Sequence, residues 1–198
     1  MSQRSIEDFK AVLQGGGVRP TMFEVELTFP EGVSSDSTEA TRDGTFLIKT
    51  AALPASNVGT IEVPFRGRKL KVSGDRTFDP WSVTIVNDVS FRLRKTMEKW
   101  AEVIQNHNYA LGSTELNDYF ASAVVRQLDR DGSILRAYAF EGIWPTQVGE
   151  IGVSFDATDS VEEYDVTFNV QYWSAANEVP FTSAVPRDPS GQFNNISS

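Results

Sequence analysis

Two segments of this sequence alternate strictly between hydrophobic and polar residues, and this pattern restricts the fold more than any other feature. They read FEVELTF over 23–29 and YDVTFNVQY over 164–172. Successive side chains of a β-strand point to opposite faces, so each segment predicts a strand with one buried and one solvated face. The chain therefore has to fold around β-sheet.

Shorter extended segments lie between these two. They cover residues 61–65, 68–72, 81–86, 123–128, 135–142 and 150–155. Asp131-Gly132, between two of these segments, predicts a tight hairpin because glycine accepts a positive φ. Short connections of this kind favour antiparallel pairing.

One long segment has helical spacing instead. Leu93, Met97, Trp100 and Ile104 recur every three or four residues, and Ser90 is the expected N-cap. A shorter helix is expected over about 6–13, ended by the glycines at 15–17. These patterns predict a mainly β fold, a β-sandwich or distorted barrel of antiparallel strands with one flanking α-helix.

The sequence also suggests three regions. Residues 1–18 read as an N-terminal short helix and a glycine-rich linker, and residues 19–173 read as the β domain. Within that domain, the polar residues 30–45 are expected to form a loop insertion. Residues 174–198, which contain proline, serine and asparagine without periodicity, read as a C-terminal extension.

The residue types leave little room for catalysis or metal binding. There is no cysteine and only one histidine, which excludes disulfides, Cys-ligated zinc and His-rich metal sites. His107 follows the long helix, whose C-terminus favours a positive charge, so a structural role is expected. No phosphate-binding loop, dinucleotide fingerprint or serine-nucleophile elbow is present. We therefore predict no catalytic residue, no metal site and no cofactor.

Charge points to the kind of partner. Eighteen basic and 27 acidic residues give a formal net charge of −9, which disfavours binding of nucleic acid by the chain as a whole. Basic residues nevertheless gather at Arg66, Arg68, Lys69 and Lys71, beside Phe65. In an acidic chain such a strip has a natural partner in an acidic surface of an identical subunit, and we favour this interpretation over DNA binding. No hydrophobic run approaches the ~20 residues of a membrane-spanning helix, so no membrane anchor is expected.

Several longer blocks of the sequence resemble one known family. They are RPTMFEVEL, TAALPASNVGTIEVPFRGRKLKVSGDRTFDPWSVTIVND, AVVRQLDRDG and GIWPTQVGEIGVSFDATDSVEEYDVTFNVQYW. In this order they resemble the tail tube proteins of myoviruses, the contractile-tailed bacteriophages. The resemblance covers most of residues 19–173 and leaves out the segment 30–45 and the residues after Trp173.

The resemblance implies a structural role in the virion tail. Members of the family form hexameric rings that stack into a hollow tube inside a contractile sheath, between a baseplate and a tail terminator. They are assembled in the host cytoplasm, and viral DNA passes through the tube during ejection without specific binding. On this basis Gly74 is expected to permit a tight backbone path and Asp75 and Arg76 to pair within or between subunits. An acidic channel is expected, with the basic strip turned toward subunit contacts.

Two alternatives stay open at the level of sequence. The chain could be the tube subunit of a secretion or bacteriocin-like contractile injection system, which shares the same architecture. It could also be a β-sandwich hydrolase or carbohydrate-binding domain. Neighbouring carboxylates such as Glu162 and Glu163 leave this second alternative open, because sequence does not give their separation in space.

Overall fold

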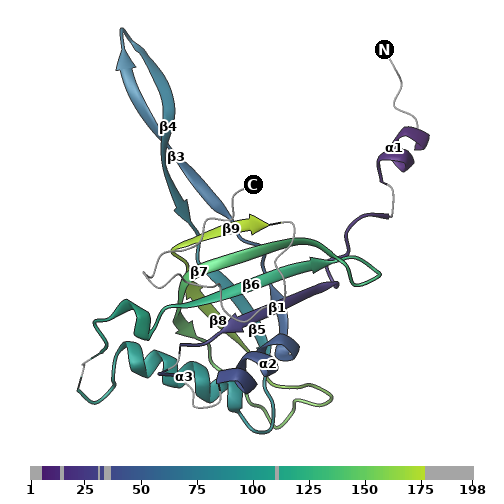
Figure 1. Cartoon of the computed structure of the whole chain (residues 1–198), viewed down its shortest axis with the longest axis vertical. Helices are drawn as coiled ribbons and strands as arrows, with labels where there is room; N and C mark the ends of the chain where they lie inside the picture. The colour runs from purple at the N-terminus through teal and green to yellow at the C-terminus, as the bar shows by residue number, and fades with distance from the viewer. Residues whose placement is uncertain (1–5, 14–15, 31, 34–36, 110–111, 177–198) are drawn as a thin grey trace, which may run out of the picture.

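The computed structural model describes residues 6–13, 16–30, 32–33, 37–109 and 112–176 (Figure 1). The helices are α1 (Ile6–Val12), α2 (Ser37–Leu47), α3 (Arg92–Ile104) and the short 3₁₀ helix η2 (Leu116–Asp118). The strands are β1 (Phe23–Thr28), β2 (Ile48–Ala51), β3 (Ser56–Phe65), β4 (Arg68–Phe78), β5 (Trp81–Val86), β6 (Ala121–Leu128), β7 (Ile134–Val148), β8 (Glu163–Asn169) and β9 (Tyr172–Ala176). The mainly β, antiparallel fold expected from the alternation is confirmed.

One long strand, β7, joins two sheets. Residues 134–143 of β7 pair with β6 and, in part, with β9, and β6 pairs with β1; we call this group sheet I. Residues 144–148 of β7 pair with β8, which pairs with β5, which pairs with β2; we call this group sheet II. The two sheets form the body in Figure 1, while β3 and β4 form a separate hairpin that projects from it.

Gly142 is where β7 changes sheets. It has a φ of 61°, and it is the extra residue of a bulge, because Ala121 pairs with Ile143 while Ser122 pairs with Glu141. A Cβ at this position would lie 2.7 Å from Cγ of Gln171, on the facing chain between β8 and β9. Only glycine fits both the backbone angle and the space, so this residue allows the bend.

The core fills the space between the sheets. Trp81 of β5 stacks on Phe140 of β7 with ring centroids 4.6 Å apart, and it also contacts Phe168 of β8. The indole Nε1 of Trp81 donates to the carbonyl oxygen of Ala52 at 2.9 Å, so the polar atom of this buried ring is satisfied. Aromatic side chains from both sheets therefore hold the sandwich together.

Helix α3 closes one end of the core, as its spacing predicts. Leu93, Met97 and Trp100 are buried, and Nε1 of Trp100 donates to the carbonyl oxygen of Tyr119 at 2.8 Å. The expectation that Ser90 caps the helix was wrong. The N-cap is Phe91, in the left-handed region at φ 54°, because the hydroxyl and amide of Ser90 bind the Asp88 carboxylate instead.

The segment 30–45 is not a simple loop, which corrects the sequence prediction. Its second half forms α2, whose Ala40 is buried and contributes to the core. Arg92 of α3 contacts Glu39 at 3.0 Å and Asp43 at 2.9 Å, and these ion pairs hold the two helices together. The helix escaped detection because its buried positions include two small residues, Ala40 and Gly44, while Leu47 is only partly buried, so no hydrophobic stripe marks it in the sequence.

Two expected strands also differ. Residues 150–155 form no strand, although hydrophobic and small residues alternate there, because no neighbouring strand of the described chain pairs with them. The segment 164–172 is divided at Val170 and Gln171 into β8 and β9, opposite the bend of β7. Strand β9 runs to Ala176, so the β domain extends past the expected boundary at 173. Residues 177–198 lie outside the described residues.

A buried arginine links β1 and β6. Arg126 is only 1% exposed, and its Nη2 lies 2.8 Å from Oε2 of Glu26, while Glu24 stands 4.0 Å away. Burial raises the pKa of Glu24 above its ordinary value, and the Arg126 charge opposes part of that rise. Glu26 is therefore the main ion-pair partner of Arg126, since a buried guanidinium needs a nearby carboxylate.

Replacing each glutamate separately should distinguish their roles. Glu26→Gln should lower the free energy of unfolding by about 2 kcal/mol, because a charge-assisted hydrogen bond to a buried group is weakened. Glu24→Gln should be neutral or slightly stabilising at pH 7, and its difference from wild type should vanish as the pH falls through the raised pKa and Glu24 becomes protonated. Denaturant titrations between pH 3 and 7 measure both effects. Equal losses at neutral pH would contradict the assignment.

Candidate assembly surfaces

The most prominent feature outside the body is the β3–β4 hairpin. Its two strands are joined by Arg66 and Gly67, both with positive φ, at 46° and 80°. This two-residue turn is the type that suits the twist of a hairpin. Nearly all side chains of the hairpin are exposed, and it extends away from both sheets in Figure 1.

One face of the hairpin is hydrophobic. Ile61 pairs with Val72, Val63 with Leu70, and Phe65 with Arg68, so these side chains share a face. The exposed fractions are 66% for Phe65 and 62% for Leu70. The sequence predicts the strands from this alternation but gives no sign that their hydrophobic face lies outside the core. Such a face on a projecting hairpin marks a contact surface for another molecule.

The opposite face is polar. Glu62 lies 2.6 Å from Nζ of Lys69 and 3.9 Å from Nζ of Lys71, across the two strands. The predicted basic strip is thus divided. Arg66 lies at the tip over the Phe65 ring, 5.4 Å from its centroid, and Arg68 lies on the hydrophobic face, while the two lysines are engaged with Glu62.

The base of the hairpin has a bulge built from two glycines. Val58 pairs with Arg76 and Thr60 with Ser73, which leaves Gly74 and Asp75 opposite Gly59. A Cβ on Gly74 would lie 3.0 Å from the carbonyl carbon of Gly59. The two backbones approach too closely for a side chain, which is the tight path that the family resemblance implies for Gly74.

Aromatic contacts fix the hairpin to the body. Phe78, at the end of β4, packs edge-to-face on Trp173 of β9 with centroids 6.1 Å apart. Nε1 of Trp173 donates to the carbonyl oxygen of Ala55 at 3.1 Å, just before β3. The amide of Asn57 donates to the Asp79 carboxylate at 2.9 Å. The aromatic and charged residues that crowd the entry to β5 therefore set the direction of the hairpin.

Asp75 and Arg76 are exposed at this base. Within the described part of the chain no ion pair joins them to each other or to a third residue. Their expected pairing inside one subunit is not observed, so a contact between subunits is the remaining part of that hypothesis.

Sheet II offers a second surface, with two open edges. Among the described strands, β2 pairs only with β5, and residues 144–148 of β7 pair only with β8. An open edge presents unpaired N–H and C=O groups that can bind another strand. Both outer strands of this four-stranded sheet are therefore available for pairing with a neighbour.

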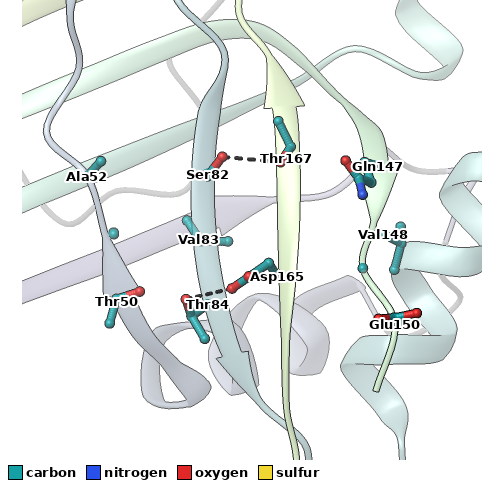
Figure 2. Close-up of a pocket in the computed structure, with 12 residues that line it drawn as sticks. Thr50, Ala52, Ser82, Val83, Thr84, Gln147, Val148, Glu150, Asp165 and Thr167 are labelled. Carbon is teal, nitrogen blue, oxygen red and sulfur yellow. Dashed lines mark hydrogen bonds between the residues drawn. The ribbon is translucent and has the colours of Figure 1, made fainter. Parts of the chain in front are cut away.

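The outward face of sheet II is hollowed and polar (Figure 2). The side chains that line it include Thr50, Ser82, Thr84, Gln147, Glu150, Asp165 and Thr167. Ser82 and Thr167 share a hydrogen bond of 3.1 Å between their hydroxyls, and Thr84 donates to Asp165 at 2.8 Å. Two carboxylates and no basic side chain line this hollow, so the face is weakly acidic.

The described residues contain neither a candidate metal site nor a candidate membrane-spanning helix. Within the described residues, no three His, Cys, Asp or Glu side chains are grouped to hold a metal ion. The helices of the described chain are too short and polar for a membrane span.

The fold and these surfaces define the class of protein: an antiparallel β-sandwich with open sheet edges and a projecting amphipathic hairpin. A family model described as phage tail tube protein matches residues 18–176. The tail tube protein gp19 of Enterobacteria phage T4 is 33% identical over 165 residues, covering 83% of this chain and 95% of gp19. The tail tube protein of Serratia phage KSP90 is 29% identical over 176 residues, covering 88% of this chain and 97% of that protein. The chain belongs to the phage tail tube protein family, and the resemblance inferred from its sequence is confirmed.

Solved structures share the fold. A chain from the sheath–tube complex of the extracellular contractile injection system PVC, in its extended state, matches with a TM-score of 0.62 and 12% identity, over 85% of this chain and 97% of that one. A chain from the tube-terminating cap of the anti-feeding prophage matches with a TM-score of 0.60 and 15% identity, over 82% of this chain and 92% of that one. At these identities the likeness establishes the fold, and the family match establishes a structural component of the virion tail. A carbohydrate-binding or hydrolase domain is not favoured.

The bulge at the base of the hairpin can be tested by substitution. Gly74→Ala should increase amide hydrogen exchange over β3 and β4 about tenfold, which corresponds to about 1.4 kcal/mol, because the added methyl group meets the Gly59 backbone. Gly44→Ala is the matched control, since a Cβ there meets nothing within 4 Å and alanine favours helix α2. Unchanged exchange in the Gly74 variant would show that the bulge tolerates a side chain.

Proposed function

We propose that this chain forms hexameric rings that stack into the tail tube, inside a contractile sheath, and that viral DNA passes through the channel. The observation that carries the proposal is the geometry of sheet II, a four-stranded sheet with an open edge on each side. A surface that is complementary to a different surface of the same molecule produces a ring when the rotation between copies closes. Pairing β2 of one copy with β7 of the next supplies such a contact.

The strand directions support this pairing. Each strand of sheet II is antiparallel to its neighbour, from β7 through β8 and β5 to β2. With an even number of strands, β2 and β7 run in opposite directions. A β2 edge beside the β7 edge of an identical copy in the same orientation is therefore also antiparallel. The sheet can continue around a ring without a change in its hydrogen-bonding pattern.

The polar face of sheet II suits the wall of the channel. Its hydroxyl groups bond to one another, and its charged lining groups in the hollow are carboxylates. A wall rich in lysine and arginine would bind DNA, because binding releases the counterions of the phosphates. An uncharged or acidic wall does not bind DNA in this way. The function proposed here requires passage and no catalytic step.

The partners follow from the same proposal. The relatives of known structure come from a sheath–tube complex, a tube-terminating cap, a sheath/tube terminator and a baseplate. We infer that the outer surface of the ring contacts a sheath protein and that the two ends of the tube meet a baseplate and a terminator. Assembly in the host cytoplasm belongs to this proposal.

Ring and tube formation can be observed directly. The purified chain, alone or with baseplates of its phage, should form hollow rings or tubes in negative-stain electron microscopy. The open β edges should favour this association because pairing satisfies backbone groups and buries hydrophobic surface. A protein that stays monomeric with and without baseplates would contradict the proposed function.

The channel wall can be tested by adding charge. Ser82→Lys with Gln147→Lys should give assembled tubes an affinity for short duplex DNA at low salt that weakens linearly with log salt, while wild-type tubes show none. Gln105→Lys with Asn108→Lys adds the same charge beyond the C-terminus of α3 and should leave binding unchanged. DNA binding by wild-type tubes, or equal binding by the two double variants, would contradict this placement of sheet II.

A further inference from the structure

The outward face of sheet I carries a row of residues that crosses all four of its strands. Residues paired directly across antiparallel strands point to the same side of a sheet. The row consists of Glu24 of β1, Arg126 of β6, Ala137 of β7 and Ala176 of β9. It faces away from the core, because Val125, the preceding residue of β6, belongs to the core.

The middle of this row is buried. Ala137 is 0% exposed and Arg126 is 1% exposed. Burial decreases along the face toward the other end of β9: in the next row Val124 and Ala139 are half-buried and Ser174 is exposed. An arginine on an open sheet face keeps its guanidinium in water, so part of the chain lies over the row of Arg126.

Neither the described helices nor the N-terminal segment covers this row. Helices α2 and α3 pack on the core side, and α1 stands apart from the sheets in Figure 1. Residues 19–22 approach β6 through Gln127, which follows Arg126 and therefore points to the opposite face. The β3–β4 hairpin is attached through Trp173, which also packs on the core side. The cover therefore comes from residues outside the described ranges.

Residues 177–198 begin in the row itself. They follow Ala176, which pairs with Ala137 at the end of β9. The other stretches outside the described ranges have at most five residues each. Neighbouring strands lie about 4.8 Å apart, so β6 is about 10 Å from β9, and five residues of extended chain span up to ~17 Å. The chain that leaves Ala176 can therefore cross β7 and β6 within its first few residues.

The composition of 177–198 suits a cover over the face of the sheet. Val179, Phe181 and Val185 supply hydrophobic side chains, and the small side chains of Ala137 and Ala139 leave space for them. The prolines at 180, 186 and 189 donate no backbone hydrogen bond, so this segment is unsuited to add a regular strand at the β9 edge. A segment that packs through its side chains suits the face of the sheet better than its edge.

We propose that residues 177–198 fold back over the outward face of sheet I of their own chain and cover the ion pair between Arg126 and Glu26. Attachment at Ala176 holds the segment close to this face, which favours it over the same segment of another copy. Exclusion of water strengthens the charge-assisted hydrogen bond beneath it. The docking takes place within one chain and does not require a ring. If sheet II lines the channel, this face lies on the outside of the tube, and only that placement rests on the proposed function.

Cysteine cross-linking tests the contact without background, because the chain has no cysteine. The full-length Val124→Cys/Phe181→Cys variant is treated with a short bismaleimide while dilute and unassembled, and linked peptides are identified by mass spectrometry. The docking predicts a link within one chain whose yield does not change with protein concentration. Ser82→Cys/Phe181→Cys is the matched control and should give at least tenfold less product, because Ser82 is exposed on the outward face of sheet II.

Alkylation rates give a second measurement. The thiol of an Ala137→Cys variant should be protected, and its alkylation rate should rise at least tenfold when Val179→Ser, Phe181→Ser and Val185→Ser weaken the cover. Ala123→Cys is the matched control, since Ala123 is 2% exposed on the core side of β6. Its alkylation rate should not change with the same three serines.

Three results would overturn the docking. The first is no link between positions 124 and 181, or a link that forms only between two chains, which would place the segment on another copy. The second is an unchanged alkylation rate at position 137. The third is an equal rise at positions 137 and 123, which would show loss of the fold and not of a cover. Failure of the wild-type chain to form tubes would contradict the proposed function and leave this docking intact.

Discussion

The fold depends on the hydrogen bonding of one strand, β7, to partners in two sheets. Its first part belongs to sheet I and its second part to sheet II, and the change occurs at Gly142, where a side chain would collide with Gln171. The segment that pairs with β7 is divided into β8 and β9 opposite this glycine. The core, the open edges of sheet II and the position of the hairpin all follow from this bend, because β5 and β8 take their places from the second part of β7.

Much of this architecture can be predicted from the sequence, because alternation reports on strands and helical spacing reports on α3. Side chains of Val25, Val83 and Val166 are buried as alternation requires. The same signal wrongly predicts a strand at 150–155. Alternation shows that a segment can form a strand, but it does not show that a neighbouring strand is there to pair with it. It misses α2, whose buried side carries the small residues Ala40 and Gly44 and the partly buried Leu47 instead of a continuous hydrophobic stripe.

The assembly surfaces are harder to predict because hydrophobicity does not distinguish a core from an interface. Val63 and Leu70 have the pattern of buried strand residues, yet they are exposed on a hairpin that no other element covers among the described residues. The division of the basic strip also depends on the register of β3 and β4. This register places Lys69 and Lys71 beside Glu62, while Arg66 and Arg68 lie near the tip. Sequence locates these residues, and only the register shows which of them share a face.

A helical reconstruction of the assembled tube by electron cryo-microscopy tests the central claim most directly. The account predicts that sheet II forms the channel wall, with Ser82, Gln147 and Thr167 facing the channel and β2 of each copy antiparallel to β7 of its neighbour in the ring. A tube in which sheet II faces outward, or in which its two edges stay unpaired, would contradict it.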